Sequence, residues 1–105
     1  EKIPLEFLVR KQTKETAETF GLMDRGQIKE GYMADINIID HENLCVYKPE
    51  MVHDLPTGSR RIIQKAGGYI ATIKSGVVTF KDDKATGELP GTVLRGERTA
   101  EAISA

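Results

Sequence analysis

The chain has 105 residues, enough for one small domain but well short of the roughly 250 residues that a (β/α)8 barrel needs. Its 15 Lys and Arg residues nearly balance 16 Asp and Glu residues, so no basic stripe is available to bind nucleic acid. The single cysteine, Cys45, excludes an internal disulfide framework and favours a reducing, cytoplasmic location. No apolar run approaches the roughly 20 residues that span a bilayer, and the first residues do not resemble a signal peptide, so no membrane partner is expected.

One helix is predicted near the start of the chain, over residues 4–20. Pro4 suits the first position of a helix because its fixed φ is already helical and its missing N–H is not needed there. The apolar face of this helix begins with Leu5, Leu8 and Val9.

The same helix is expected to be broken and then to stop at a glycine. Polar Gln12, Thr13 and Thr16 interrupt the apolar face, and threonines lose side-chain freedom in a helix, which predicts a break near residues 13–16. Gly21 then provides a stop, because glycine adopts the left-handed conformation at little cost.

After this helix, glycines punctuate short apolar runs, a rhythm typical of strands and turns. The clearest predicted strand covers residues 34–40. Two further strands, over residues 68–74 and 77–81, are predicted to form a hairpin around the two-residue turn Ser75-Gly76. Residues 82–84 are then predicted to form another polar turn.

The remaining segments are predicted to lack regular structure. Residues 41–63 contain two prolines and little alternation, so they are expected to form a long loop between strands. Two glycines and a proline in residues 86–91 indicate an extended, turn-rich segment. The fold class predicted from these elements is α+β, mainly β, with one N-terminal helix followed by a small β-sandwich-like sheet.

Two histidines lie beside acids, in Asp40-His41 and His53-Asp54, and imidazole with carboxylate is a workable zinc ligand set. The two pairs are twelve positions apart, which matches no compact ligand spacing. Both are therefore interpreted as turn or solvent-facing residues, and no metal site is predicted.

Four other features also lack a predicted catalytic role. Cys45 has apolar neighbours, which favours a buried small hydrophobe over a nucleophile. Asp35 and Asp40 bracket a strand, on the order of 16 Å apart and on opposite faces, so they are interpreted as caps and hydrogen-bond acceptors in turns. Arg60-Arg61, beside Gly58-Ser59, offers a small anion site, but two exposed arginines more often form a solvated face. Gly67-Gly68 is not a nucleotide-loop fingerprint. No catalytic, cofactor-binding or metal-binding residue is predicted.

Several short motifs follow one another in a fixed order along the chain; they are LVRKQT at 8–13, FGL at 20–22, DRG at 24–26, Ile28, Gly31, AD at 34–35 and IID at 38–40. This order resembles the C-terminal passage of the amidohydrolase superfamily. The later residues are Pro56, Gly58, SGV at 75–77 and TGELPGTVLR at 86–95, and they resemble the N-acyl-D-amino-acid deacylase, or D-aminoacylase, branch.

The resemblance implies a domain layout. Residues 1–21 would be the last helix of a catalytic barrel, residues 22–96 the C-terminal part of a small β-sandwich, and residues 97–105 a flexible tail. In such enzymes this composite domain also takes strands from the extreme N-terminus. Asp35 would accept backbone hydrogen bonds from the preceding Gly31 turn and so have a structural role.

The resemblance also implies what the chain does. The zinc ligands and catalytic aspartate of the family lie on barrel strands and match no position here, so the chain is expected to be inactive alone, although the parent enzyme hydrolyses the amide of N-acyl-D-amino acids with zinc. Its expected partners are the barrel of the parent chain and a further copy in a homo-oligomer. The alternative is a self-standing β-rich interaction module without catalysis.

Overall fold

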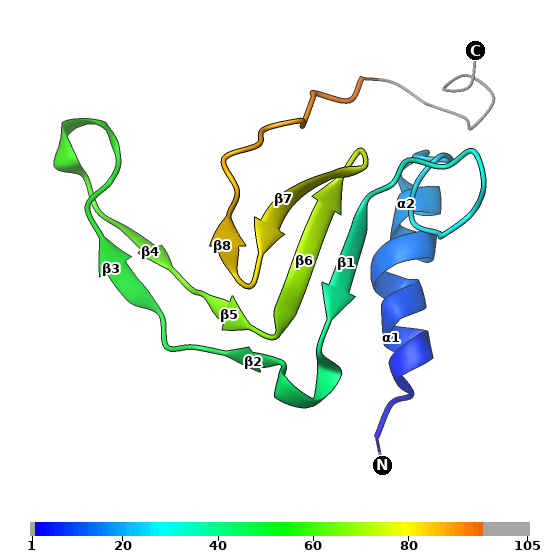
Figure 1. Ribbon diagram of the computed structural model, residues 1–105, viewed down its shortest axis with the longest axis horizontal. Helices are drawn as coiled ribbons and strands as arrows, with labels where there is room; N and C mark the ends of the chain where they lie inside the picture. The colour runs from blue at the N-terminus through cyan, green and yellow to red at the C-terminus, as the bar shows by residue number, and fades with distance from the viewer. Residues whose placement is uncertain (1, 96–105) are drawn as a thin grey trace. The chain divides into compact units, whose positions relative to one another are not determined.

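The structure is a computed structural model that describes residues 2–95; the tail predicted at 97–105 lies outside the described residues. It confirms the α+β, mainly β fold class, with one helix followed by short strands (Figure 1). The described residues divide into two compact units, one formed by residues 2–36, 73–77 and 89–95 and the other by residues 37–72 and 78–88.

The helix of the first unit runs without interruption from Leu5 to Thr19. Its three parts are α1 (Leu5–Arg10), a π-helical turn (Lys11–Glu15) and α2 (Thr16–Thr19). Pro4 has an extended ψ of 138° and caps the helix, so it is not the first helical residue. No helix in the described part of the chain has the length and apolar character needed to cross a membrane.

The break predicted at residues 13–16 is a widened turn instead. Thr16 donates its hydroxyl hydrogen bond to the carbonyl of Lys11, five residues earlier, at 2.6 Å. Thr13 similarly bonds to the carbonyl of Val9 at 2.6 Å. Such bonds from hydroxyl to backbone compete with the regular α-helical pattern, and a single π turn absorbs the change without ending the helix.

The helix ends at Thr19, and Gly21 then reverses the chain with a φ of +73°, as the sequence predicts. The N–H of Leu22 donates to the carbonyl of Ala17 at 2.8 Å, and that of Gly21 to Glu18 at 3.1 Å. This is the Schellman arrangement, in which a left-handed residue turns the chain back to cap the last carbonyls.

Four strands form the larger sheet, in the order β1-β6-β7-β8. Their bounds are β1 Ile36–Ile39, β6 Tyr69–Lys74, β7 Val77–Lys81 and β8 Lys84–Ala85. Strand β1 is shorter than predicted, because Ala34, Asp35 and Asp40 lie outside it. The polar turn predicted at 82–84 is confined to Asp82-Asp83, since Lys84 already begins β8.

The turn between β6 and β7 is Ser75-Gly76, as predicted, with φ of +52° and +80°. Two positive φ values are what a type I′ hairpin turn requires. A Cβ at Gly76 would meet nothing within 4 Å, so only the backbone angle opposes a side chain there. A substitution at Gly76 therefore measures the free-energy cost of the positive φ without a steric contribution.

Replacing Gly76 with valine should lower the free energy of unfolding by about 1 kcal/mol or more, because a β-branched residue fits a positive φ poorly. The measurement is urea denaturation of the two proteins side by side. Gly91→Val is the matched control, since Gly91 also faces open space but has no positive φ. Equal losses for the two variants would contradict the prediction.

The long loop predicted at residues 41–63 was wrong, because this segment contains paired strands. Strand β2 (Cys45–Val46) pairs antiparallel with β5 (Ala66–Gly67), and β3 (Glu50–Val52) pairs antiparallel with β4 (Arg61–Ile63). These two separate two-stranded sheets follow one another along the same pair of chain segments and form one long ribbon, visible in Figure 1.

A bulge interrupts this ribbon. Three residues, 47–49, separate β2 from β3, whereas two, 64–65, separate β4 from β5. The extra residue lies in the segment that contains Pro49, which has no N–H to donate to a partner strand. Strands of two or three residues around a bulge show no alternation long enough to recognise in the sequence.

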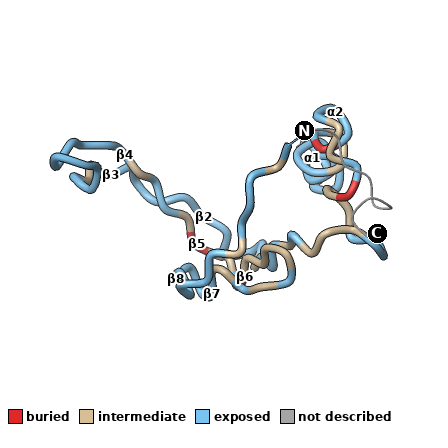
Figure 2. Tube along the Cα trace, turned by 90° about the horizontal axis from the view of Figure 1, so that it is seen from above, coloured by how far each residue is buried: buried red, intermediate tan, exposed pale blue. Residues whose placement is uncertain are grey.

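Buried residues are few in either unit. Among residues 2–95, only Ala17, Asp24, Gly67 and Ala71 are buried, as Figure 2 shows by colour. Many large apolar side chains on the helix and on the ribbon are exposed instead.

Candidate functional site

In the first unit, four charged side chains form a group that we call the Asp35 cluster; they are Asp24, Arg25, Asp35 and Lys74. Arg25 Nη1 donates to Asp35 Oδ2 at 2.6 Å, and Lys74 Nζ to Asp35 Oδ1 at 3.1 Å. The backbone N–H of Ser75 also donates to Asp35 Oδ1, at 2.9 Å. Asp35 therefore ties the turn between β6 and β7 to the segment that follows the helix.

The ionised form of Asp35 is favoured in this setting. Partial burial acts to raise the pKa of its carboxyl group, but the hydrogen bonds from Ser75 and Lys74 and the positive charges of Lys74 and Arg25 outweigh it. The net result is a pKa below the usual value. The predicted structural role of Asp35 is therefore observed, but the backbone donor is Ser75 and not the Gly31 turn.

Asp24 is the buried member of the cluster, with none of its surface exposed. Arg25 Nε lies 3.4 Å from Asp24 Oδ1. Neither carboxylate oxygen has a hydrogen-bond partner within the described residues. The guanidinium of Arg25 thus lies between the carboxylates of Asp24 and Asp35 and holds their two segments together. This arrangement provides no activated nucleophile.

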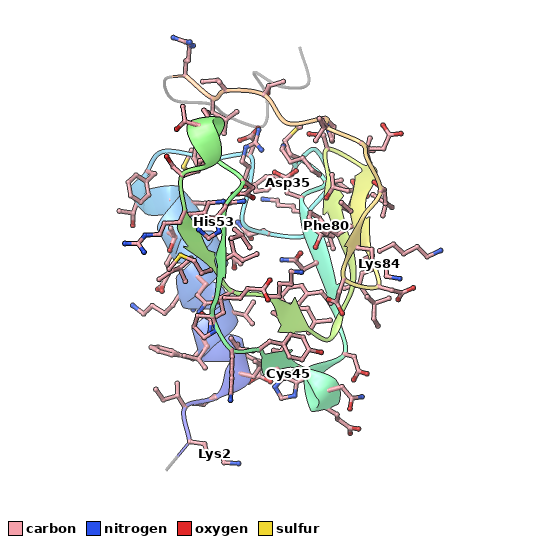
Figure 3. The ribbon with its side chains drawn as sticks, turned by 90° about the vertical axis from the view of Figure 1, so that its left-hand side faces the viewer. Lys2, Asp35, Cys45, His53, Phe80 and Lys84 are labelled. Atoms are coloured by element: carbon pink, nitrogen blue, oxygen red, sulfur yellow. The ribbon has the colours of Figure 1, made fainter. Side chains whose placement is uncertain are left out.

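The two histidines are not brought together with their acidic neighbours into one site. Asp40 Oδ2 accepts a hydrogen bond from Asn43 Nδ2 at 2.7 Å, at the short 3-10 turn His41–Asn43. His53 follows β3 (Figure 3). Its neighbour Asp54 accepts a hydrogen bond from Arg61. Within residues 2–95, no three His, Cys, Asp or Glu side chains are grouped to hold a metal ion.

The Arg60-Arg61 pair is not a free anion site. Arg61 donates two bonds to the two carboxylate oxygens of Asp54, each 2.6 Å long. The hydrogen bond from Arg61 lowers the pKa of Asp54, and the same bond raises the pKa of the guanidinium. These two bonds join the two ends of the loop between β3 and β4, so Arg61 has a structural role in that loop.

The prediction that Cys45 is buried was wrong. Cys45 is exposed on β2 and lies directly opposite Gly67, which has no side chain to cover it. The Tyr47 hydroxyl also lies over Gly67, where an added Cβ would be 2.7 Å from that oxygen and 3.1 Å from Cys45 Sγ. The hydrogen bond with Cys45 raises the pKa of the Tyr47 phenol.

Gly68 has a packing role that explains the Gly67-Gly68 pair without a nucleotide. Its φ is +96°, and an added Cβ would lie 2.7 Å from the Cα of Leu44. Two backbone segments thus approach each other at this point, which only glycine allows.

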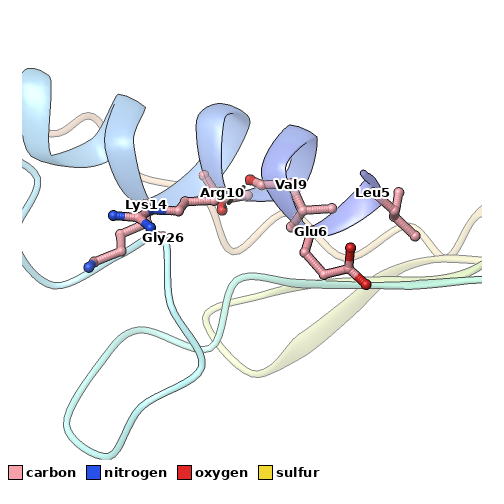
Figure 4. Close-up of a pocket in the computed structure, with 7 residues that line it drawn as sticks. Leu5, Glu6, Val9, Arg10, Lys14 and Gly26 are labelled. Carbon is pink, nitrogen blue, oxygen red and sulfur yellow. Dashed lines mark hydrogen bonds between the residues drawn. The ribbon is translucent and has the colours of Figure 1, made fainter. Parts of the chain in front are cut away.

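An apolar groove runs along the helix of the first unit, with a volume of about 410 Å³ (Figure 4). Its lining residues are Leu5, Glu6, Val9, Arg10, Thr13, Lys14 and Gly26. Leu5 and Val9 are each about half exposed, at 47% and 49%. Apolar side chains left open along a groove are typical of a surface that another protein element covers.

The comparisons with known proteins point to the same family as the order of the sequence motifs. Residues 1–80 match the model of the amidohydrolase family. The chain is 35% identical over 91 residues to a D-aminoacylase of Alcaligenes xylosoxydans xylosoxydans; the match covers 87% of this chain and 17% of that relative. No solved structure matches. The chain thus belongs to the amidohydrolase family, as a D-aminoacylase-like member.

Proposed function

We propose that this chain is a non-catalytic C-terminal domain of a larger, zinc-dependent amidohydrolase that hydrolyses the amide of N-acyl-D-amino acids. One observation carries the proposal: the match to a D-aminoacylase covers 87% of this chain but 17% of the relative. A match that covers most of one chain and a small part of the other is expected when the first is one domain of a longer enzyme. The whole protein's activity therefore belongs to residues beyond this sequence.

In this proposal the domain braces the catalytic barrel. The helix supports it, because its groove exposes Leu5 and Val9, and burying such side chains stabilises by about 1.5 to 3 kcal/mol each. The strands would complete a β-sandwich with strands from elsewhere in the protein. A further copy in a homo-oligomer is the second proposed partner, and the proposed location is the cytoplasm.

The described residues do not fit a zinc ion. Asp54 is neutralised by Arg61, Asp40 is bonded to Asn43, and no third ligand joins either histidine within residues 2–95. We therefore assign zinc to the catalytic domain and derive no reaction step from the residues of this chain.

The purified chain should release no amino acid from N-acyl-D-amino acids, with or without added zinc, because the groups that bind metal and substrate would lie in the catalytic domain. The measurement is amino-acid release over hours at high protein concentration. The positive control is the protein expressed from the complete reading frame. Zinc-dependent turnover that survives repurification and is lost in His41→Ala would overturn the proposal.

A further inference from the structure

We infer that the ribbon formed by β2, β3, β4 and β5 docks, through one apolar face, onto an apolar patch of the catalytic domain in the family-length protein. This inference rests on the proposed function. It concerns a different surface from the helix groove, because the ribbon belongs to the second unit.

The two faces of the ribbon differ in chemistry. Met51 lies directly opposite Ile62, and residues directly opposite each other in an antiparallel pair share a face. The neighbouring pair, Glu50 with Ile63, points to the other face because successive residues alternate. Lys65 lies 3.7 Å from Glu50, which places it on that same, charged face.

Alternation also extends the apolar face across the bulge. Ile62 and Ala66 are four residues apart on one strand and therefore share a face. Val46 lies opposite Ala66 and joins them. The extra residue at 47–49 keeps Val46 and Met51 on one side, where a regular strand would place residues five apart on opposite sides.

This apolar face is open. Val46 is 69% exposed, Met51 49% and Ile62 67%. By contrast Ile63, on the charged face, is partly buried. A two-stranded ribbon alone is marginally stable in water and needs a further strand or packed element to persist. A covering surface is therefore expected over Val46, Met51 and Ile62.

The size of the face decides between a second copy and a domain of the same protein. Three such side chains expose on the order of 300 Å², whereas a stable dimer needs about 800 Å² from each partner. A domain in the same chain is held nearby at high effective concentration, so a small patch is enough. The relative offers that domain, because this chain spans 17% of its length.

The chemistry of the face sets the character of the covering surface. Its exposed apolar side chains, Val46, Met51 and Ile62, carry no charge and no strong hydrogen-bonding group. Alternation places Gln64 beside them, and its amide Nε2 already donates to the backbone carbonyl of Tyr47 at 3.1 Å. A polar surface that packed over the three apolar side chains would lose its hydrogen bonds to water and gain no hydrogen bonds from them in return. The occupant is therefore an apolar patch, with the ion pair of Glu50 and Lys65 left on the solvent side.

Oxidation of Met51 by peroxide, followed by mass spectrometry, tests this inference because thioether oxidation follows exposure. Met51 should react on the order of tenfold more slowly in the protein from the complete reading frame than in the 105-residue chain. Ile62→Lys in the complete protein should restore the fast reaction. Glu50→Lys, the matched control on the charged face, should leave Met51 protected.

The possible outcomes separate the two proposals. Equal oxidation rates in the complete protein and the 105-residue chain would overturn the docking of the ribbon but leave the accessory-domain proposal intact. Protection that depends on concentration in the 105-residue chain would assign the face to a second copy and also overturn it. A complete reading frame without a further domain would overturn both.

Discussion

Replacing Gly26 with alanine should lower the free energy of unfolding by about 3 kcal/mol, because the change combines two unfavourable terms. The φ of Gly26 is +88°, which costs an L-residue about 1 to 2 kcal/mol. The new Cβ would also lie 2.7 Å from the carbonyl oxygen of Thr13 and 3.0 Å from the Cβ of Ala17, an overlap costing about 1 to 3 kcal/mol. Neither atom is the flexible end of a long side chain, so the loop or the helix must shift.

Gly31→Ala is the matched control for this prediction. Gly31 has a φ of +82°, but a Cβ there would meet nothing within 4 Å. It should lose only the backbone term, about 1 to 2 kcal/mol. Urea denaturation of both variants with the parent chain measures the difference. Equal losses would show that residues 24–26 do not approach the helix as closely as the structure places them.

The features that the sequence predicts correctly depend on local chemistry. The stop at Gly21 and the turn at Ser75-Gly76 each require positive φ values, which a short run of residues reveals. The family was also recognisable, because its motifs keep their order along the chain. The helix was predictable in position, while its π turn depends on the hydroxyl of Thr16 bonding to the carbonyl of Lys11.

The features that the sequence misses depend on partners far along the chain. Asp35 receives its bonds from Lys74 and Ser75, 39 and 40 residues later, so no local spacing could indicate them. The sequence predicts a loop where the ribbon lies, because the strands of the ribbon are two or three residues long and show no recognisable alternation. The apolar neighbours of Cys45 along the chain predict burial, yet Cys45 is exposed on β2, opposite Gly67 of β5.

The charge of Asp35 should contribute about 1 to 2 kcal/mol to stability at neutral pH, and Asp35→Asn should remove most of it. Hydrogen bonds to a charged group contribute about 1.5 to 3 kcal/mol, and the 29% exposure of this side chain reduces that figure. Asparagine keeps an oxygen that can accept the hydrogen bond from the N–H of Ser75. It has no negative charge, so the electrostatic attraction to Arg25 and Lys74 is lost. Asp54→Asn is the control, since its ion pair with Arg61 is about half exposed and should matter less.

The effect of pH on the Asp35 variant has a definite sign. The folded state lowers the pKa of Asp35, so the stabilisation is present above the unfolded-state pKa of about 3.9 and is lost as the pH falls through the lower, folded-state pKa. The difference in unfolding free energy between parent and Asp35→Asn should therefore be constant from pH 7 to about pH 5 and shrink below about pH 4. Urea denaturation at neutral and acidic pH measures it. A difference that persists unchanged at the lowest pH would mean that the loss of stability comes from the shape of the amide and not from the lost charge. That outcome would contradict an electrostatic role for the Asp35 cluster in holding the β6–β7 turn to the segment after the helix.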